Sequence, residues 1–214
     1  MYKEKLPSRL LENAVDAIST LPGVGERSAL RLAMHLLRTP QENVHHFTDA
    51  IIALRDNVQY CHHCHMISDE QVCSICADHT RDHSTICIVE NVQDVMSIEK
   101  TGAYHGVYHV LGGVISPING IGPADLTIAK LKDRLTAMTP ADSCGEDNAI
   151  EVIMALPGDV EGETTAFYIY RQIAPLGVKI TAIARGLGFG DGLQYADAMT
   201  LGRSIAGRQP FKIQ

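Results

Sequence analysis

The apolar positions between Ser8 and Pro40 recur every three or four residues, the spacing of amphipathic helices. The first series follows Ser8, which is a good helix N-cap, and comprises Leu10, Leu11, Ala14, Val15 and Ile18. The second runs from Glu26 towards Pro40 and comprises Leu30, Ala33, Met34 and Leu37. Because Leu21-Pro22-Gly23-Val24-Gly25 separates them, the pattern predicts a helix-hairpin-helix.

A third apolar series predicts a helix over 43–57. We expect this helix to serve as scaffold and to turn its apolar residues inward, namely Val44, Phe47, Ile51, Leu54 and Val58.

After Arg81 the pattern changes to strands and helices in alternation. Short apolar runs predict strands at 85–90, 106–111, 149–156 and 178–184, and amphipathic segments between them predict helices at 92–100, 124–135 and 163–174. Such alternation is typical of a mainly parallel sheet with helices on both faces. The expected fold class is therefore a multi-part α+β chain in which an α/β domain follows the helical region.

Two Cys-x-x-Cys pairs, Cys61/Cys64 and Cys73/Cys76, stand between the helical and the α/β regions. Four thiolates complete the tetrahedron that Zn²⁺ prefers, and they leave no open position for a substrate. The sequence predicts one structural Zn²⁺ per chain, whose binding drives the folding of this short segment. The neighbouring histidines are alternative ligands that the sequence leaves open: His62, His63 and His65.

The hairpin carries the residues expected to bind an anion. Gly23 and Gly25 let the backbone turn tightly, and the second helix presents N–H groups at its start. Arg27 and Arg31 stand one turn apart and can reach phosphates from the same face. Contacts of this kind are insensitive to base sequence. The alternative from these residues is a plain αα-hairpin with two solvated arginines.

Charge is distributed unevenly along the chain. The 214 residues have a formal net charge of −7, yet residues 1–40 hold six cations and four anions. A basic N-terminal segment joined to an acidic remainder fits a protein that binds a polyanion at one local site and repels it from the rest of its surface.

Acidic residues follow two of the predicted strands: Glu90 after the first, and Asp159, Glu161 and Glu163 after the third. In a parallel sheet these positions meet at one edge, where carboxylates can hold Mg²⁺ or form a docking surface. The alternative without a function is a solvated loop beside a helix N-terminus, where the helix dipole favours carboxylates. The pattern resembles the Toprim fold of topoisomerases and primases, although Pro157 stands where that fold has the first aspartate of its metal-binding pair.

Several classes of protein are excluded. No run approaches the ~18 apolar residues that span a bilayer, and the N-terminus lacks an apolar signal region, so we expect a cytoplasmic protein without membrane contact. No Gly-Lys dipeptide occurs, which removes the P-loop and with it any expected ATP hydrolysis. The segment 186–214 should form a helix from about 195 to 206. It offers Phe189, Leu193, Tyr195 and Met199 either to its own domain or to a neighbouring subunit.

The order of these parts resembles the RecR family of bacterial recombination mediators. The resemblance rests on the cysteine spacing and on residues 21–37, 102–123, 160–169 and 183–208. It implies a homotetrameric ring clamp on DNA that acts with RecO, and in many bacteria RecF, to place RecA on gapped DNA coated with single-strand-binding protein. It also implies that Arg27 and Arg31 contact DNA, that the four cysteines bind zinc, and that the Toprim carboxylates face RecO.

We therefore expect four parts: a helix-hairpin-helix region (1–57), a zinc finger (58–80), a Toprim-like domain (81–185) and a C-terminal tail that contacts another subunit (186–214). The leading hypothesis is a DNA clamp and adaptor without catalytic residues. One alternative is a Mg²⁺-dependent phosphoryl-transfer enzyme, nuclease or primase-like, that uses Glu90, Asp159 and Glu161. Another is a pure protein–protein adaptor whose hairpin only makes the oligomer.

Overall fold

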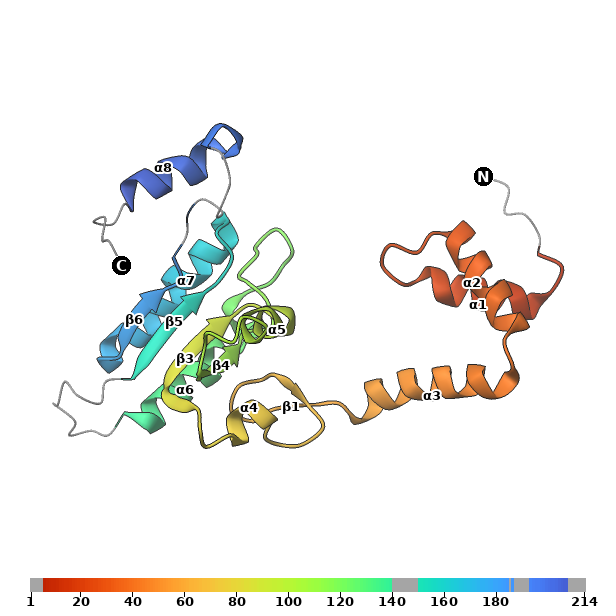
Figure 1. The fold of residues 1–214 in the computed structure, drawn as a ribbon, viewed down its shortest axis with the longest axis horizontal. Helices are drawn as coiled ribbons and strands as arrows, with labels where there is room; N and C mark the ends of the chain where they lie inside the picture. Colours follow the sequence, from red (N-terminus) through yellow and green to blue (C-terminus); the bar gives the residue numbers. More distant parts are fainter. Residues whose placement is uncertain (1–5, 140–149, 185, 187–192, 208–214) are drawn as a thin grey trace. The chain divides into compact units, whose positions relative to one another are not determined.

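The computed structural model describes residues 6–139, 150–184, 186 and 193–207 (Figure 1). The chain forms two compact units, Met1–Val58 and Gln59–Gln214. No helix among the described residues is long and apolar enough to cross a bilayer.

The N-terminal unit begins with two helices, α1 (Arg9–Ser19) and α2 (Glu26–Arg38). The Ser8 side chain caps α1 by accepting a hydrogen bond from the Leu10 N–H. The two helices pack through small and branched residues, with Val15, Ala29 and Ala33 buried between them. The predicted helix-hairpin-helix is therefore present.

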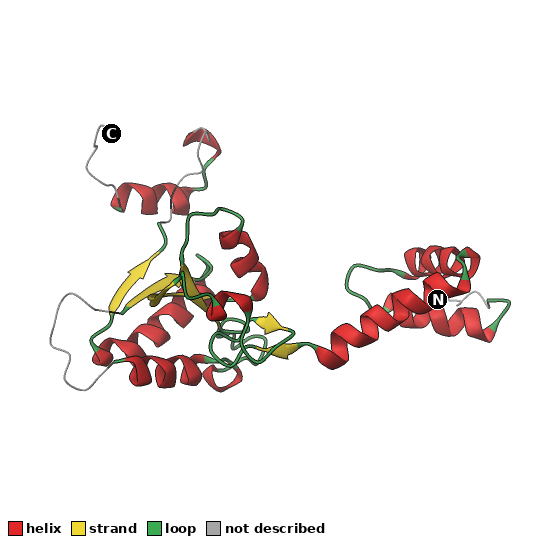
Figure 2. Ribbon diagram, turned by 60° about the horizontal axis from the view of Figure 1, so that its bottom comes forward, coloured by secondary structure: helices red, strands yellow, loops and turns green. Residues whose placement is uncertain are grey.

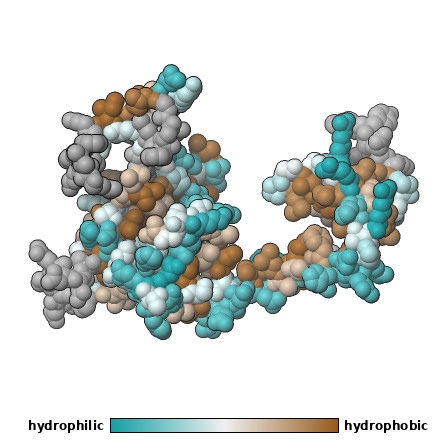
Figure 3. Space-filling model, in the orientation of Figure 1, coloured by the Kyte–Doolittle hydropathy of each residue, from teal (hydrophilic) through white to brown (hydrophobic). Residues whose placement is uncertain are grey.

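The third helix, α3 (Gln41–Asn57), starts two residues before the predicted position and differs from expectation in its burial. None of its residues is buried, and Phe47, Ile51 and Leu54 are 52%, 51% and 62% exposed. Figure 3 shows apolar side chains gathered along this helix. The prediction that these residues point inward was wrong. Periodicity shows which face of a helix is apolar, but it does not show which surface covers that face.

The C-terminal unit opens with the cysteine segment. Its strands β1 (Gln59–Tyr60) and β2 (Ile67–Ser68) pair antiparallel, and the short helix α4 (Ser74–Ala77) follows. We call residues 59–78 the zinc knuckle.

The rest of this unit is a four-stranded sheet in which every strand pair is parallel. The strand order is β4 (Gly106–Val110), β3 (Asp82–Val89), β5 (Glu151–Ala155) and β6 (Lys179–Ala182). As expected for alternating α/β segments, α5 (Val92–Glu99) covers one face, while α6 (Ile128–Met138) and α7 (Val160–Ile173) cover the other (Figure 2).

Successive residues of β3 serve the two faces of the sheet. Ile86 and Ile88 join the core under α6 and α7, whereas Cys87 and Val89 pack on the side of α5. Helix α6 begins later than predicted, because Pro123–Asp125 form a separate 3₁₀ turn. The fold class of the sequence analysis is confirmed.

The tail contains a 3₁₀ turn (Leu193–Tyr195) and α8 (Ala198–Ala206). Leu193 and Tyr195 are 63% and 82% exposed. Phe189 and the Met199 side chain lie outside the described part of the chain.

Candidate nucleic-acid interface and zinc site

The four predicted cysteines converge on one point. The Sγ atoms of Cys61, Cys64, Cys73 and Cys76 all lie within 4.8 Å of one another. A Zn–S bond of about 2.3 Å in a tetrahedron places sulfurs about 3.8 Å apart, and the Cys64 and Cys73 sulfurs are separated by 3.5 Å. The donor set therefore fits a four-cysteine zinc site, and no histidine joins this group in the described part of the chain.

Backbone hydrogen bonds hold the first Cys-x-x-Cys turn in place. The Cys61 N–H donates to the Met66 carbonyl at 2.8 Å, and the His65 N–H returns to the Cys61 carbonyl at 2.9 Å. His65 adopts a φ of 60°, which completes the turn. The Cys73 N–H donates to the Cys61 sulfur at 3.4 Å, so the second pair is bonded to the first.

Protons in this cluster are shared unequally. The hydrogen bond between Cys64 and Cys73 lowers the pKa of Cys73 and raises that of Cys64, so Cys73 loses its proton before Cys64. Zn²⁺ would displace the remaining protons and satisfy all four sulfurs. With four protein ligands such a site is closed, and its role is structural.

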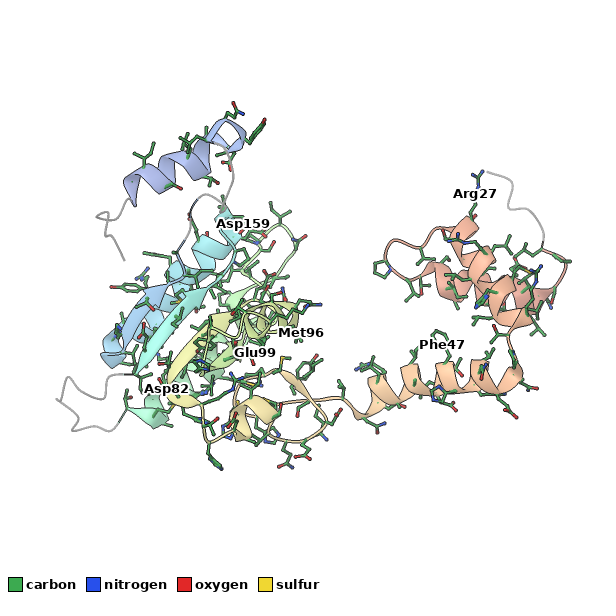
Figure 4. The ribbon with its side chains drawn as sticks, in the orientation of Figure 1. Arg27, Phe47, Asp82, Met96, Glu99 and Asp159 are labelled. Atoms are coloured by element: carbon green, nitrogen blue, oxygen red, sulfur yellow. The ribbon has the colours of Figure 1, made fainter. Side chains whose placement is uncertain are left out.

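The hairpin presents its glycines and arginines to solvent. Gly23 has a φ of 79°, and no atom lies within 4 Å of where a Cβ would stand on Gly23 or Gly25. Gly25 is the N-cap of α2, so no capping side chain bonds to the first-turn N–H groups. Arg27 and Arg31 are exposed on the first two turns of α2, and Figure 4 shows Arg27 extending outward. The arrangement can receive a phosphate by backbone amides and guanidinium groups together.

Three predicted carboxylates meet at the carboxyl edge of the sheet. Burial raises the pKa of Glu90, and the charges of Asp94, Asp159 and Glu161 raise it further. Asp159 lies at the opposite end of the sheet from Asp82, as Figure 4 shows. The edge therefore concentrates negative charge, as expected for strands that run in parallel.

Two of these carboxylates already accept protein hydrogen bonds. Asp159 caps α7 by accepting from the Gly162 N–H at 2.7 Å, and Glu161 accepts from the Ser116 hydroxyl at 2.5 Å. A Cβ on Gly162 would overlap the Pro157 carbonyl, so only glycine permits this cap. Glu163 is exposed and lies about 200° around the helix from Glu161, on the other side of α7.

The comparisons with known proteins agree along nearly the whole chain. Family models match residues 11–55 (RecR, helix-hairpin-helix), 58–78 (the RecR zinc finger domain with four cysteines), 84–184 (Toprim domain) and 186–209 (RecR, C-terminal). The recombination protein RecR of Porphyromonas gingivalis is 53% identical over 208 residues, which cover 97% of this chain and 96% of that protein. The recombination protein RecR of Parabacteroides distasonis is 50% identical over 98% of this chain and 97% of its own length. That of Flavobacterium johnsoniae is 49% identical over 96% of this chain and 95% of its own length.

The chain belongs to the RecR family. Its function therefore lies in DNA recombination and repair as a mediator, which confirms the resemblance seen in the sequence. RecR mediators are generally non-catalytic despite their Toprim domain, in agreement with the expectation that this chain is not an enzyme. The RecR zinc finger model covers all four cysteines, which supports the structural Zn²⁺ inferred from their geometry.

The sequence analysis missed two residues of this RecR acidic edge. Asp94 forms a capping box with Asn91 at the start of α5, and its charge reaches Glu90. The Asn-x-x-Asp spacing was a readable signal for it. Ser116 had no signal, because only the fold brings its loop against α7.

Proposed function

We propose that this chain is a DNA clamp and adaptor that grips the sugar-phosphate backbone of duplex and gapped DNA through Gly23, Gly25, Arg27 and Arg31. The single observation that carries the proposal is the exposed pair of guanidinium groups beside an open, glycine-capped helix start. None of these groups reads a base edge, so binding is independent of sequence. The clamp helps to place RecA on DNA coated with single-strand-binding protein.

Several copies of the chain act together as a homotetrameric ring. The exposed apolar stripe of α3, formed by Phe47, Ile51 and Leu54, supports an assembly, since a second copy would remove this surface from water. The exposed Leu193 and Tyr195 of the tail support a further subunit contact. A ring also multiplies weak hairpin contacts through multivalency.

The carboxylates at this end of the domain recruit RecO, and RecF in organisms that use it: Glu90, Asp159 and Glu161 form the acidic face, and Glu163 adds a charge on the other side of α7. The observation in support is the convergence of three of these carboxylates with Asp94, which gives one edge of the domain a strong negative field. Such a field increases the association rate of a basic partner more than it increases the binding affinity.

The test of DNA binding is the salt dependence of affinity in Arg27→Ala/Arg31→Ala. Losing two phosphate contacts per chain should weaken binding to any DNA sequence and lower the log–log salt slope by about two units per bound chain. Arg38→Ala/Arg55→Ala removes the same charge from exposed positions outside the hairpin turn and is the matched control. If Arg27→Ala/Arg31→Ala binds DNA with the affinity of the parent chain at several salt concentrations, the proposal is refuted.

A further inference from the structure

A cavity of about 540 Å³ lies within the C-terminal unit, between the zinc knuckle, the start of β3 and one side of α6. Its wall is unusually rich in imidazoles, which are His62, His63, His65 and His83. The side of α6 that faces the cavity includes Lys130, Asp133, Arg134, Ala137 and Met138, a series with helical spacing. Cys76 of the zinc site also lines the cavity, but none of these imidazoles or α6 side chains belongs to the four-cysteine group.

Arg134 is held in place by the protein itself. Its Nη1 donates to the His63 carbonyl at 3.1 Å and to the Tyr108 carbonyl at 2.8 Å. These bonds tie α6 to the knuckle and to β4. No acidic side chain of the described residues lies within ion-pair distance of Arg134 or of Lys130, one turn away. A pre-oriented guanidinium therefore lines the cavity with its charge unneutralised.

The wall has a positive balance of charge. Asp133 is the one carboxylate among the lining residues, against the two cations Lys130 and Arg134. The positive charge of Arg134 also acts on the buried His109: burial lowers the pKa of His109 to about 3, and the Arg134 charge lowers it further. His109 meets His65 edge-to-face, with ring centroids 5.2 Å apart. An anion would complement this wall.

We propose that this cavity binds the phosphate of a nucleotide, with Lys130 and Arg134 taking the phosphate oxygens. Guanidinium and ammonium groups are the usual partners of phosphate, and imidazole N–H groups add further donors. The volume is that of a small-molecule site, and Ala137 and Met138 supply an apolar patch against which a sugar or base can lie.

The same phosphate chemistry has two sources, a free nucleotide and a nucleotide within a single strand. Titration calorimetry with ATP, pyrophosphate and a short oligothymidine separates them. All three are measured on the zinc-loaded full chain carrying Arg27→Ala/Arg31→Ala, so that the two hairpin guanidinium groups contribute nothing. The outcome is then independent of the proposed clamp function.

Lys130→Glu should lower the affinity for the bound probe about tenfold or more, because an attractive contact becomes a repulsive one. Lys132→Glu is the matched control: it makes the same charge change at an exposed α6 position outside the cavity, and should change affinity less than twofold. His83 lines the cavity away from the cysteines, with its Nε2 bonded to the Asp78 carbonyl at 3.1 Å, and His83→Ala should weaken binding by a smaller factor. Zinc content and circular dichroism verify that each variant is folded.

Loss of ATP and pyrophosphate binding in Lys130→Glu alone would support a free nucleotide. Loss of oligothymidine binding alone would support a strand. If none of the probes binds, or if Lys130→Glu and Lys132→Glu lose affinity equally, the proposed site is overturned. Should Lys130→Glu fail to fold, Lys130→Gln together with His83→Ala decides by the same criterion.

Discussion

Arg81 and Glu99 are joined by two parallel hydrogen bonds, Nη1 to Oε1 at 3.0 Å and Nη2 to Oε2 at 2.5 Å. Arg81 directly precedes β3, and Glu99 is the last residue of α5. Arg81 also donates to the Gly106 carbonyl at 3.1 Å, and the Tyr108 hydroxyl donates to Glu99 at 2.6 Å. This partly buried pair ties the exit of the zinc knuckle to α5 and β4.

Arg81→Ala should lower the free energy of unfolding by about 2 kcal/mol or more, because it leaves the Glu99 carboxylate half-buried without its partner. Urea denaturation at pH 7 measures the change. Lys179→Ala breaks the Lys179–Glu151 pair, whose lysine is 60% exposed, and serves as the control. It should cost no more than about 1 kcal/mol. Equal losses in the two variants would show that the Arg81 pair has no special role.

Glu90 and Glu99 should respond to pH in opposite directions. The Arg81 hydrogen bond lowers the pKa of Glu99, so its contribution to stability is present above its unfolded pKa of about 4.5 and is lost as the pH falls through the folded value. Burial and neighbouring carboxylates raise the pKa of Glu90. That contribution is present below the unfolded pKa and is lost as the pH rises through the folded value.

Glu90→Gln should therefore raise the melting temperature at pH 7–8, where Glu90 is charged in a negative field, and the gain should shrink towards pH 4.5. Differential scanning calorimetry across this range checks the sign. Glu163→Gln removes a charge from an exposed position on the other side of α7, and should give a smaller gain. A gain for Glu90→Gln that grew on acidification would contradict the assigned cause.

Removal of zinc should destabilise more than the knuckle. The Val110 N–H donates to the Cys64 carbonyl at 2.8 Å, so β4 is bonded to the metal-binding segment. Cys73→Ser, or treatment with a chelator, should abolish the one-to-one zinc content and lower the melting temperature of the C-terminal unit. Cys87→Ala alters a buried cysteine outside the site and should keep its zinc. Full zinc content in Cys73→Ser would refute the four-cysteine assignment.

The exposed stripe of α3 predicts an effect on assembly. Phe47→Asp/Ile51→Asp places two charges on that stripe, and should reduce the mass measured by light scattering while leaving the α1–α2 pair folded. His45→Asp places a charge on the other side of the helix and should leave the mass unchanged. An unaltered mass in the double variant would remove α3 from the subunit contacts.

Local chemistry explains why the helix starts, the turn and the zinc site could be predicted from the sequence. Ser8 marked the start of α1, Leu21 to Gly25 marked the turn, and the doubled Cys-x-x-Cys marked the zinc site. Each depends on groups a few residues apart, whose geometry the backbone itself determines. The alternating strands and helices were readable for the same reason.

The burial of α3 could not be predicted in this way. Its periodicity was correct and the helix formed, yet Phe47, Ile51 and Leu54 remain exposed. The pattern of one segment says which face is apolar, and a second surface must supply the partner.

By itself, the amino-acid sequence determined the helical hairpin, the four-sulfur metal site and the parallel α/β order, because short-range spacing and capping specify them. Only the tertiary structure decided that Asp94 and Ser116 join the acidic edge, and that four imidazoles meet Lys130 and Arg134 around one cavity. Those groups lie far apart along the chain, and the packing of the sheet, helices and knuckle is what brings their charges together.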